Sequence, residues 1–469
     1  MRIAQRKPRL NRLAACLSAA FALGAADISA EARGLPQAGL SAGITYRVGA
    51  LLQAATASTT RNVISCADDG SVGTLRQVIG ISGETDTVDL SAVPIACSTI
   101  TLVSGEIPIT LNDLSLHGPT DRTLTITTSG YNRLLHHTGI GTLAIDHLTL
   151  SHGKYSSDTG DAFGGCVNSS GGVVLTSSVV TGCMVSVTRM GGFPSLAGGG
   201  AIYAKNFVQL HHSQITGNYA LAFSSNRAQG GGVVSRGLYG YDSSVSGNSA
   251  LGTSVSSTGE GGAAAVGGSV YLVRSTIDSN QADFAGGIYQ SAAPSDSVRI
   301  RNSTISGNKA NGGVGGIYAD SPLRIDNSTV AFNSANSDAA IDIKASVITN
   351  SSIIAKNSIS VSGFADLYIS GSGSTLTGSN NLIVSSNLSL SGTLTSNPRL
   401  APLANHGGPT RTHALVPLSP AVDQGNNTFP LTFDQRGSPF SREVPSGSPD
   451  IGAYERQVND DEIFYDGVE

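Results

Sequence analysis

The stretch Ser213-Gln214-Ile215-Thr216-Gly217-Asn218 returns along the chain, and it decides the fold. Its pattern is a Ser, then an Ile or Val two residues later, then an Asn three residues after that. Further copies stand at 243–248, 275–280, 303–308, 328–333 and 352–357, and an earlier copy at 178–183 has Cys in place of Asn. The aligned positions lie 24 to 35 residues apart, so the sequence predicts a repeat protein.

The composition of each repeat indicates strands. Apolar residues alternate with polar ones, as in Leu323, Ile325 and then Val330, which is the period of a strand. Thr, Ser, Val and Ile fill these segments while Gly, Asn and Asp interrupt them. About 24 residues suits one coil of three short strands. We therefore predict an all-β parallel solenoid, in which the longer intervals are the same coil with an inserted loop.

The repeated Asn has a predicted structural role. Asn is one of the few residues besides Gly that tolerates a left-handed bend, and its amide both donates and accepts hydrogen bonds. Stacked coils would place each Asn above the next, about 4.8 Å away. We expect an internal ladder made of Asn218, Asn248, Asn280, Asn308, Asn333 and Asn357.

A second position of the repeat carries tyrosine. Glycine pairs lead into short apolar stretches that end in Tyr203, Tyr289 and Tyr318. Tyrosines at one repeat position are expected to stack across coils. Such a column either packs or binds the apolar faces of sugar rings, and packing is the commoner outcome.

The two ends of the chain differ from the repeats. Residues 1–30 have a basic start followed by an apolar run and small residues, which predicts a signal peptide cleaved after Ala26 or Ala30. Residues 31–60 read as a linker, and residues 61–396 as the solenoid. A short helix within 70–79, with Ser71 or Thr74 as its N-cap, is expected to close the first coil.

Four cysteines remain once Cys16 leaves with the signal peptide: Cys66, Cys97, Cys166 and Cys183. An even count in an exported chain suggests disulfides, and four cysteines allow three pairings. Proximity favours Cys66–Cys97 and Cys166–Cys183. No spacing resembles a zinc site, and no metal ligand is predicted.

From residue 397 onward the sequence no longer follows the repeat pattern. Turn-forming residues joined to charged ones over 397–457 predict a compact C-terminal cap held by hydrogen bonds and buried ion pairs. A converged site is the alternative for the same side chains. The residues concerned are His413, Asp423, Asp434, Arg436, Asp450 and Glu455. Residues 458–469 form an acidic tail that is either a sorting signal or a frayed terminus.

These phrases together resemble a known family. The glycine pairs, the Ser-Thr-Ile/Val-Ser-Gly-Asn copies and the order of motifs after 397 look like secreted bacterial proteins of the pectate-lyase-like superfamily with a choice-of-anchor C-terminal domain. The resemblance implies a right-handed parallel β-helix with an irregular C-terminal cap. The final phrase, 463–469, is similar to one found on some Gram-negative secreted proteins.

Composition and motifs argue against several functions. The chain has 469 residues, 13% of them charged, and a net charge of −5, which does not suit a nucleic-acid binder. A lyase on this fold would need clustered acids for Ca²⁺ and a base, and a glycosidase would need paired carboxylates. The acids of the coils are scattered, so no catalytic residue and no cofactor is predicted. Four arginines, Arg274, Arg299, Arg301 and Arg324, form either a basic stripe for an acidic glycan or solvent-facing charges.

The sequence therefore predicts an exported extracellular or cell-surface scaffold, non-catalytic, acting as an adhesin or as a glycan- or surface-binding protein. The alternative is a polysaccharide lyase or glycoside hydrolase. A polysaccharide or a host or cell surface is the expected partner, with no nucleic acid. We expect a monomer with no transmembrane segment after signal cleavage.

Overall fold

The structure is a computed structural model that describes residues 58–457, apart from 192–193, 255 and 444–446. The predicted signal peptide, residues 31–57 of the predicted linker and the acidic tail lie outside the described residues. Helix α2 (Leu75–Gly80) has Thr74 as its N-cap, and the side chain of Thr74 accepts a hydrogen bond from the backbone N–H of Gln77. No helix within the described part of the chain has the length and apolar character needed to cross a membrane.

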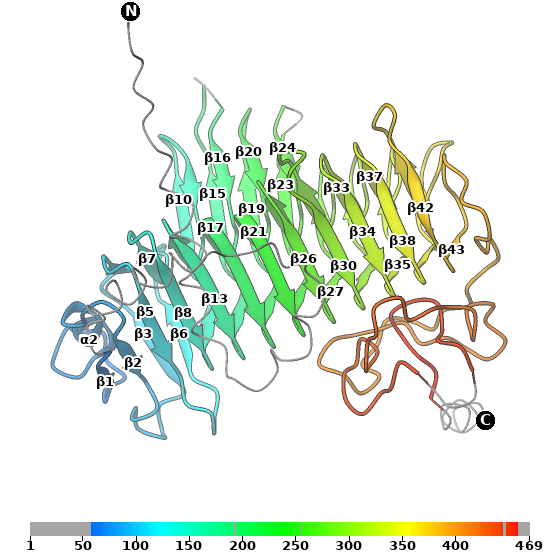
Figure 1. The fold of residues 1–469 in the computed structure, drawn as a ribbon. Coiled ribbons are helices and arrows are strands. Elements are labelled where there is room, and N and C mark those ends of the chain that lie inside the picture. The colour runs from blue at the N-terminus through cyan, green and yellow to red at the C-terminus, as the bar shows by residue number, and fades with distance from the viewer. Residues whose placement is uncertain (1–57, 192–193, 255, 444–446, 458–469) are drawn as a thin grey trace, which may run out of the picture. The chain divides into compact units, whose positions relative to one another are not determined.

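Parallel strand pairing between successive coils builds the molecule (Figure 1). One sheet of 11 strands runs from β3 (Thr99–Leu102) to β43 (Leu382–Ile383), and one of 8 runs from β10 (Lys154–Ser157) to β40 (Ser358–Ile359). The largest sheet has 20 strands because β17 (Ile202–His211) and β21 (Val233–Tyr241) continue around a corner and join two faces. These stacked coils confirm the predicted parallel β-helix.

The long repeat intervals contain an extra strand. A sheet of four strands consists of β11 (Ala162–Phe163), β16 (Leu196–Gly198), β20 (Arg227–Gln229) and β24 (Thr258–Glu260). All four lie in coils where the interval between repeats is 30 residues or more. The inserted residues thus extend the coil outward and pair with the inserts above and below, which places new strands beside the tyrosine position.

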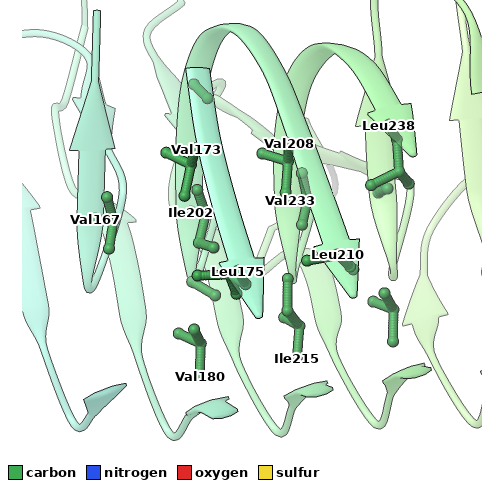
Figure 2. Close-up of a cluster of buried hydrophobic side chains, with 14 of the residues drawn as sticks. Val167, Val173, Leu175, Val180, Ile202, Val208, Leu210, Ile215, Val233 and Leu238 are labelled. Carbon is green, nitrogen blue, oxygen red and sulfur yellow. The ribbon is translucent and has the colours of Figure 1, made fainter. Parts of the chain in front are cut away.

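The interior is a column of aliphatic side chains. Val180, Ile215 and Ile305 occupy the same register position on three strands of the 11-stranded sheet and are 0% exposed. Figure 2 shows their neighbours from the other faces, such as Val173 and Leu210, pointing into the same interior. Each buried aliphatic side chain of this size stabilises the fold by roughly 1.5–3 kcal/mol. Strand alternation in the sequence arises from this one-sided burial.

The structure brings the six repeated Asn residues into one column, which is buried except at its last member, the partly exposed Asn357. Each side-chain Nδ2 donates to the Oδ1 of the Asn in the next coil, at 2.8 Å from Asn218 to Asn248 and 3.0 Å from Asn248 to Asn280. The same Oδ1 also accepts the backbone N–H of the preceding Asn, at 3.0 Å and 2.9 Å respectively. The column begins at Cys183, whose backbone N–H donates to Asn218, and ends where Asn357 donates to Asp366 at 2.8 Å.

The left-handed bend lies one residue before the Asn. Gly217, Gly247 and Gly307 have φ angles of 65°, 63° and 63°, while Ser279 and Phe332 adopt 57° and 58° at the same position. We expected Asn itself to supply the bend. The Asn side chain instead only makes hydrogen bonds. The left-handed position before it is held by Gly217, Gly247 and Gly307, because Gly adopts a positive φ without steric cost.

A ladder of serines runs beside the asparagine column. The backbone N–H of Ser213 donates to the hydroxyl of Ser243 at 3.0 Å, and Ser275 donates likewise to Ser303 at 3.0 Å. The series continues from Ser178 to Ser352, where the N–H of Ser352 donates to the amide oxygen of Asn381. The repeated Ser marked this ladder in the sequence, but we assigned it no role.

Two disulfides join Cys66 to Cys97 and Cys166 to Cys183. This confirms the two pairings that sequence proximity favours. The second bridge ties the start of one coil to Cys183, the first residue of the asparagine column. It therefore fastens the interior ladder at its N-terminal end.

The C-terminal segment, residues 397–457, is irregular and packs on the outer side of the 11-stranded sheet. Gln435 is fully buried, and its amide donates to the hydroxyl of Thr276 at 2.9 Å and accepts from the hydroxyl of Thr304 at 2.6 Å. The backbone N–H of Ala453 donates to Thr329 at 3.1 Å. These threonines face outward from β27 (Thr276–Asp278), β31 (Thr304–Ser306) and β35 (Thr329–Ala331). The segment therefore covers a lateral face of several coils, in addition to packing on β43.

Candidate binding groove

One outward-facing row of the solenoid carries the predicted tyrosine position through successive coils. Strand register pairs Tyr203 with Val234, Val234 with Ala265, Ala265 with Tyr289, and Tyr289 with Tyr318. The three tyrosines therefore share a row, as the repeat predicts. Two small residues separate Tyr203 from the other two.

The two small residues create a groove. Val234 and Ala265 form its floor, while Tyr203 and Tyr289 stand at its ends, three strand spacings or about 14 Å apart along the stack. The groove encloses about 320 Å³. This volume lies at the lower end of the range of small-molecule sites, which is roughly 300–1,000 Å³. The groove is long enough for a short run of sugar rings.

Each end tyrosine is supported by another aromatic ring. Tyr203 packs on Phe163 with ring centroids 4.3 Å apart, and Tyr289 stacks on Tyr318 at 5.3 Å with ring planes 7° apart. Burial raises the pKa of both Tyr203 and Tyr289, with a smaller contribution from Asp161 and Glu260 respectively. Both phenols stay neutral at physiological pH and can donate a hydrogen bond to a ligand.

Tyr318 is placed differently from our expectation. It is only 7% exposed, because Phe284 covers its ring with centroids 5.1 Å apart. Its hydroxyl donates to Asp320 at 3.1 Å, and the ammonium of Lys344 lies 5.0 Å from the ring centroid. Tyr318 therefore braces Tyr289 from behind and does not line the groove.

The two long rims of the groove carry different charges. Lys205 and Arg236 are exposed on one rim, and within the described residues neither of them makes an ion pair. Gln229 lies on the other rim, where its amide donates to Glu260 at 2.7 Å. Arg227 holds the same carboxylate with bonds of 2.8 and 2.7 Å. The net charge beside the groove is positive, which favours an anionic ligand.

The acids near the groove stand outside its lining. Among the described residues that line it there is no Asp or Glu. Glu260 is paired with Arg227 there, and Asp320 accepts a hydrogen bond of 2.9 Å from the lining residue Ser291. The arrangement offers aromatic platforms, hydrogen-bond donors and two cations, which is the chemistry of binding.

Three of the four arginines of the basic stripe, Arg299, Arg301 and Arg324, line one groove, and two of the four are paired with acids. Arg274 is held by Asp242 through two bonds of 2.7 Å, and Arg324 donates to Asp326 at 2.7 Å. The guanidinium of Arg301 lies 4.3 Å from the ring centroid of Phe429, a residue of the C-terminal segment. Arg299 is exposed beside these groups in a second groove of about 270 Å³.

Four of the six residues predicted for the C-terminal segment, Asp434, Arg436, Asp450 and Glu455, meet in a closed cluster. Asp434 binds Arg436 at 2.9 and 2.7 Å, and both are almost fully buried. The guanidinium of Arg436 lies 3.8 Å from the ring centroids of both Phe440 and Tyr454. These contacts leave no room for a ligand between the charges, which favours the structural role.

Glu455 and Asp450 belong to the same cluster. The backbone N–H of Asp450 donates to Glu455 at 2.8 Å, and Arg442 lies 3.3 Å from the Glu455 carboxylate. Burial raises the pKa of both acids above the ordinary range. Arg442 was missed by the sequence analysis, although it is the largest fully buried side chain. No signal in a single sequence distinguishes it from an exposed arginine.

His413 and Asp423 lie outside the centre of this cluster. The Nδ1–H of His413 donates to the carbonyl of Ala401 at 2.7 Å, so its Nε2 accepts from the hydroxyl of Ser306 at 2.8 Å. Burial lowers the pKa of His413 to about 4, which keeps the ring neutral. Asp423 is exposed and contacts Asp450 through its backbone N–H alone. The six predicted residues thus do not converge on one site.

Sequence reasoning missed most of the groove. It named the tyrosines but not Val234, Ala265, Lys205 or Arg236. The available signal was the absence of Tyr at the two intermediate coils, where small residues must leave a gap in an otherwise aromatic row. Finding that gap requires the strand register, since the intervals between coils vary.

Comparisons with known proteins add little to this geometry. No family model matches the sequence, and no curated protein matches it. Among solved structures, the crystal structure of pectate lyase Pel9A is similar, with 13% sequence identity and a TM-score of 0.43, over 86% of this chain and 98% of that one. A likeness at this level says nothing about the activity of the present chain.

Proposed function

We propose that this chain is an exported, non-catalytic β-helix scaffold that binds an acidic polysaccharide in the groove between Tyr203 and Tyr289. The observation that carries the proposal is the gap in the tyrosine row, where Val234 and Ala265 leave space between two braced aromatic rings. Lys205 and Arg236 beside this gap supply the cations that would attract carboxylate or sulfate groups. A surface of this kind suits an adhesin or another glycan-binding protein of the cell exterior.

The disulfides and the C-terminal segment support the remaining parts of this proposal. Disulfides form and persist in oxidising compartments, which agrees with export by the N-terminal signal peptide. We assign residues 397–457 to a choice-of-anchor type of segment on the basis of the resemblance of its motifs. In this proposal the segment stabilises the solenoid and the protein acts as a monomer at the cell surface or in the medium.

A groove-filling substitution tests the proposal. Ala265→Tyr restores the aromatic row, and the ring fits because tyrosine already stands at the same register position in three other coils. Binding to acidic glycans, first found on an array and then measured by calorimetry, should weaken at least about ten-fold, or about 1.4 kcal/mol. Tyr131→Ala, which removes an exposed tyrosine elsewhere, should leave affinity unchanged.

The rim charges give a second arm of the same experiment. Lys205→Gln combined with Arg236→Gln should reduce the preference for acidic over neutral glycans, and should flatten the dependence of affinity on salt. Analysis of the bound glycan after long incubation distinguishes binding from cleavage. Shortened or unsaturated products would replace our proposal by the alternative, a polysaccharide lyase or glycoside hydrolase.

A further inference from the structure

Two histidines and an aspartate gather at a corner of the solenoid, far from the groove in sequence. His117 is the last residue of β5 (Leu114–His117), and Asp146 is the last residue of β8 (Thr142–Asp146). The parallel register pairs these two residues directly, since β5 and β8 are neighbours (Figure 1). His147 follows Asp146 in a turn and has a left-handed φ of 52°.

The carboxylate of Asp146 lies between the two imidazoles. Its Oδ2 is 2.7 Å from Nδ1 of His117, and its Oδ1 is 2.6 Å from Nδ1 of His147. The three potential ligand atoms all lie within 4.8 Å of one another. The side chains themselves are about one-third exposed, so a small ion could reach them from solvent.

One of the two contacts is not explained by hydrogen bonding. The contact of His117 with Asp146 has hydrogen-bond geometry. The contact of His147 with Asp146 does not, although both atoms are shielded from solvent at 2.6 Å. An unprotonated Nδ1 this close to a carboxylate oxygen would be repelled by it, and a cation bound by both atoms removes that repulsion. A metal cation would satisfy both, together with Nδ1 of His117.

We propose that His117, Asp146 and His147 form a binding site for a divalent transition-metal ion, with Zn²⁺ as the representative. Imidazole nitrogen and carboxylate oxygen are zinc ligands, with bonds of about 2.0–2.2 Å. Ca²⁺ and Mg²⁺ prefer sites made of oxygen atoms, and these three residues offer a single carboxylate. Three protein ligands leave one position of a tetrahedral ion for water. The ion would join two successive coils near the N-terminal end of the solenoid.

The test uses the full chain, purified without a histidine tag and stripped of metal with EDTA. Calorimetric titration with Zn²⁺ should show one ion bound per chain, and Ca²⁺ should not compete. His117→Ser, Asp146→Asn and His147→Asn should each weaken Zn²⁺ binding at least about ten-fold. Asn is chosen at position 147 because it tolerates the left-handed turn.

His212→Asn is the matched control. His212 occupies the equivalent left-handed turn position two coils later and is exposed, so its loss should leave Zn²⁺ affinity unchanged. Far-UV circular dichroism checks the fold of each variant, and the visible spectrum of Co²⁺ added to the unmodified chain provides a reading that needs no variant. Absence of Zn²⁺ binding and of a Co²⁺ spectrum would overturn the proposal, and so would an equal loss of affinity in His212→Asn.

Discussion

The asparagine column and the charged cluster of the C-terminal segment are both polar and buried, yet they are built in opposite ways. The column repeats one neutral amide, which donates with its NH₂ and accepts with its oxygen, so each copy satisfies the next. The cluster uses charges such as Asp434 and Arg436, each of which needs its own partner. A neutral, self-complementary group can be extended by adding coils, whereas an ionic cluster cannot be repeated without a new partner for every charge.

The largest effect is expected inside the column. Asn280→Ala leaves the backbone N–H of Asn248 without its acceptor. It also removes one hydrogen bond each from the side-chain amide of Asn248, the oxygen of Asn308 and the carbonyl of Val245. At roughly 1–3 kcal/mol for the orphaned N–H and roughly 1 kcal/mol for each of the three other lost hydrogen bonds, the free energy of unfolding should fall by about 4–6 kcal/mol in chemical denaturation. Asn311→Ala, an exposed asparagine in the next coil, serves as the control and should cost less than about 0.5 kcal/mol.

Breaking the ionic cluster should cost somewhat less. Arg442→Met removes one of two buried cations and leaves Glu455 and Asp450 without it, which should lower the free energy of unfolding by about 3–5 kcal/mol. The loss should appear first as protease sensitivity of residues 397–457. The exposed Arg299→Met is the comparison. Equal sensitivity of the two variants would contradict a structural role for the cluster.

The N-terminal end of the column offers a third comparison. Replacing Cys166 and Cys183 together by Ser opens a loop with a sequence separation of 17 residues. Chain entropy predicts a loss of about 3 kcal/mol. Both the double variant and the reduced wild-type protein should unfold at a lower temperature than the oxidised wild-type protein. A stability equal to that of the oxidised protein would show that the ladder needs no covalent fastening.

The C-terminal end of the asparagine column contacts the carboxyl group of Asp366, so the free energy of unfolding should depend on pH. Burial raises the pKa of Asp366 from 3.8 to about 6, while Asn357 and Ser385 donate to it and partly offset this effect. Because the folded pKa is raised, the contribution of Asp366 to stability is fully present below about pH 4 and is lost as the pH rises through 6.

Asp366→Asn keeps an acceptor for Asn357 but cannot ionise. Relative to the wild type, this variant should gain about 2 kcal/mol of stability between pH 4 and pH 8, the smallest of the four effects. Paired denaturation curves at the two pH values measure the gain, and Asp158→Asn, in an exposed position, should show none. A constant difference between variant and wild type across this pH range would show that Asp366 titrates normally.

The sequence by itself determined the solenoid, because a coil must repeat its pattern to stack. Period-two alternation predicted the strands, and the recurring Asn predicted one position that faces the interior. The disulfide pairing also followed from proximity along the chain. These features are local or periodic along the chain, so they can be recognised without a three-dimensional structure.

The tertiary structure alone decided the sites. Tyr203 and Tyr289 are 86 residues apart in the numbering, and only the register of the intervening coils shows that Val234 and Ala265 lie between them. In the same way, His117 meets Asp146 because coils of unequal length end in the same corner. Inserted loops shift sequence spacing without shifting strand register, so the surface of a solenoid cannot be reconstructed from intervals along its chain.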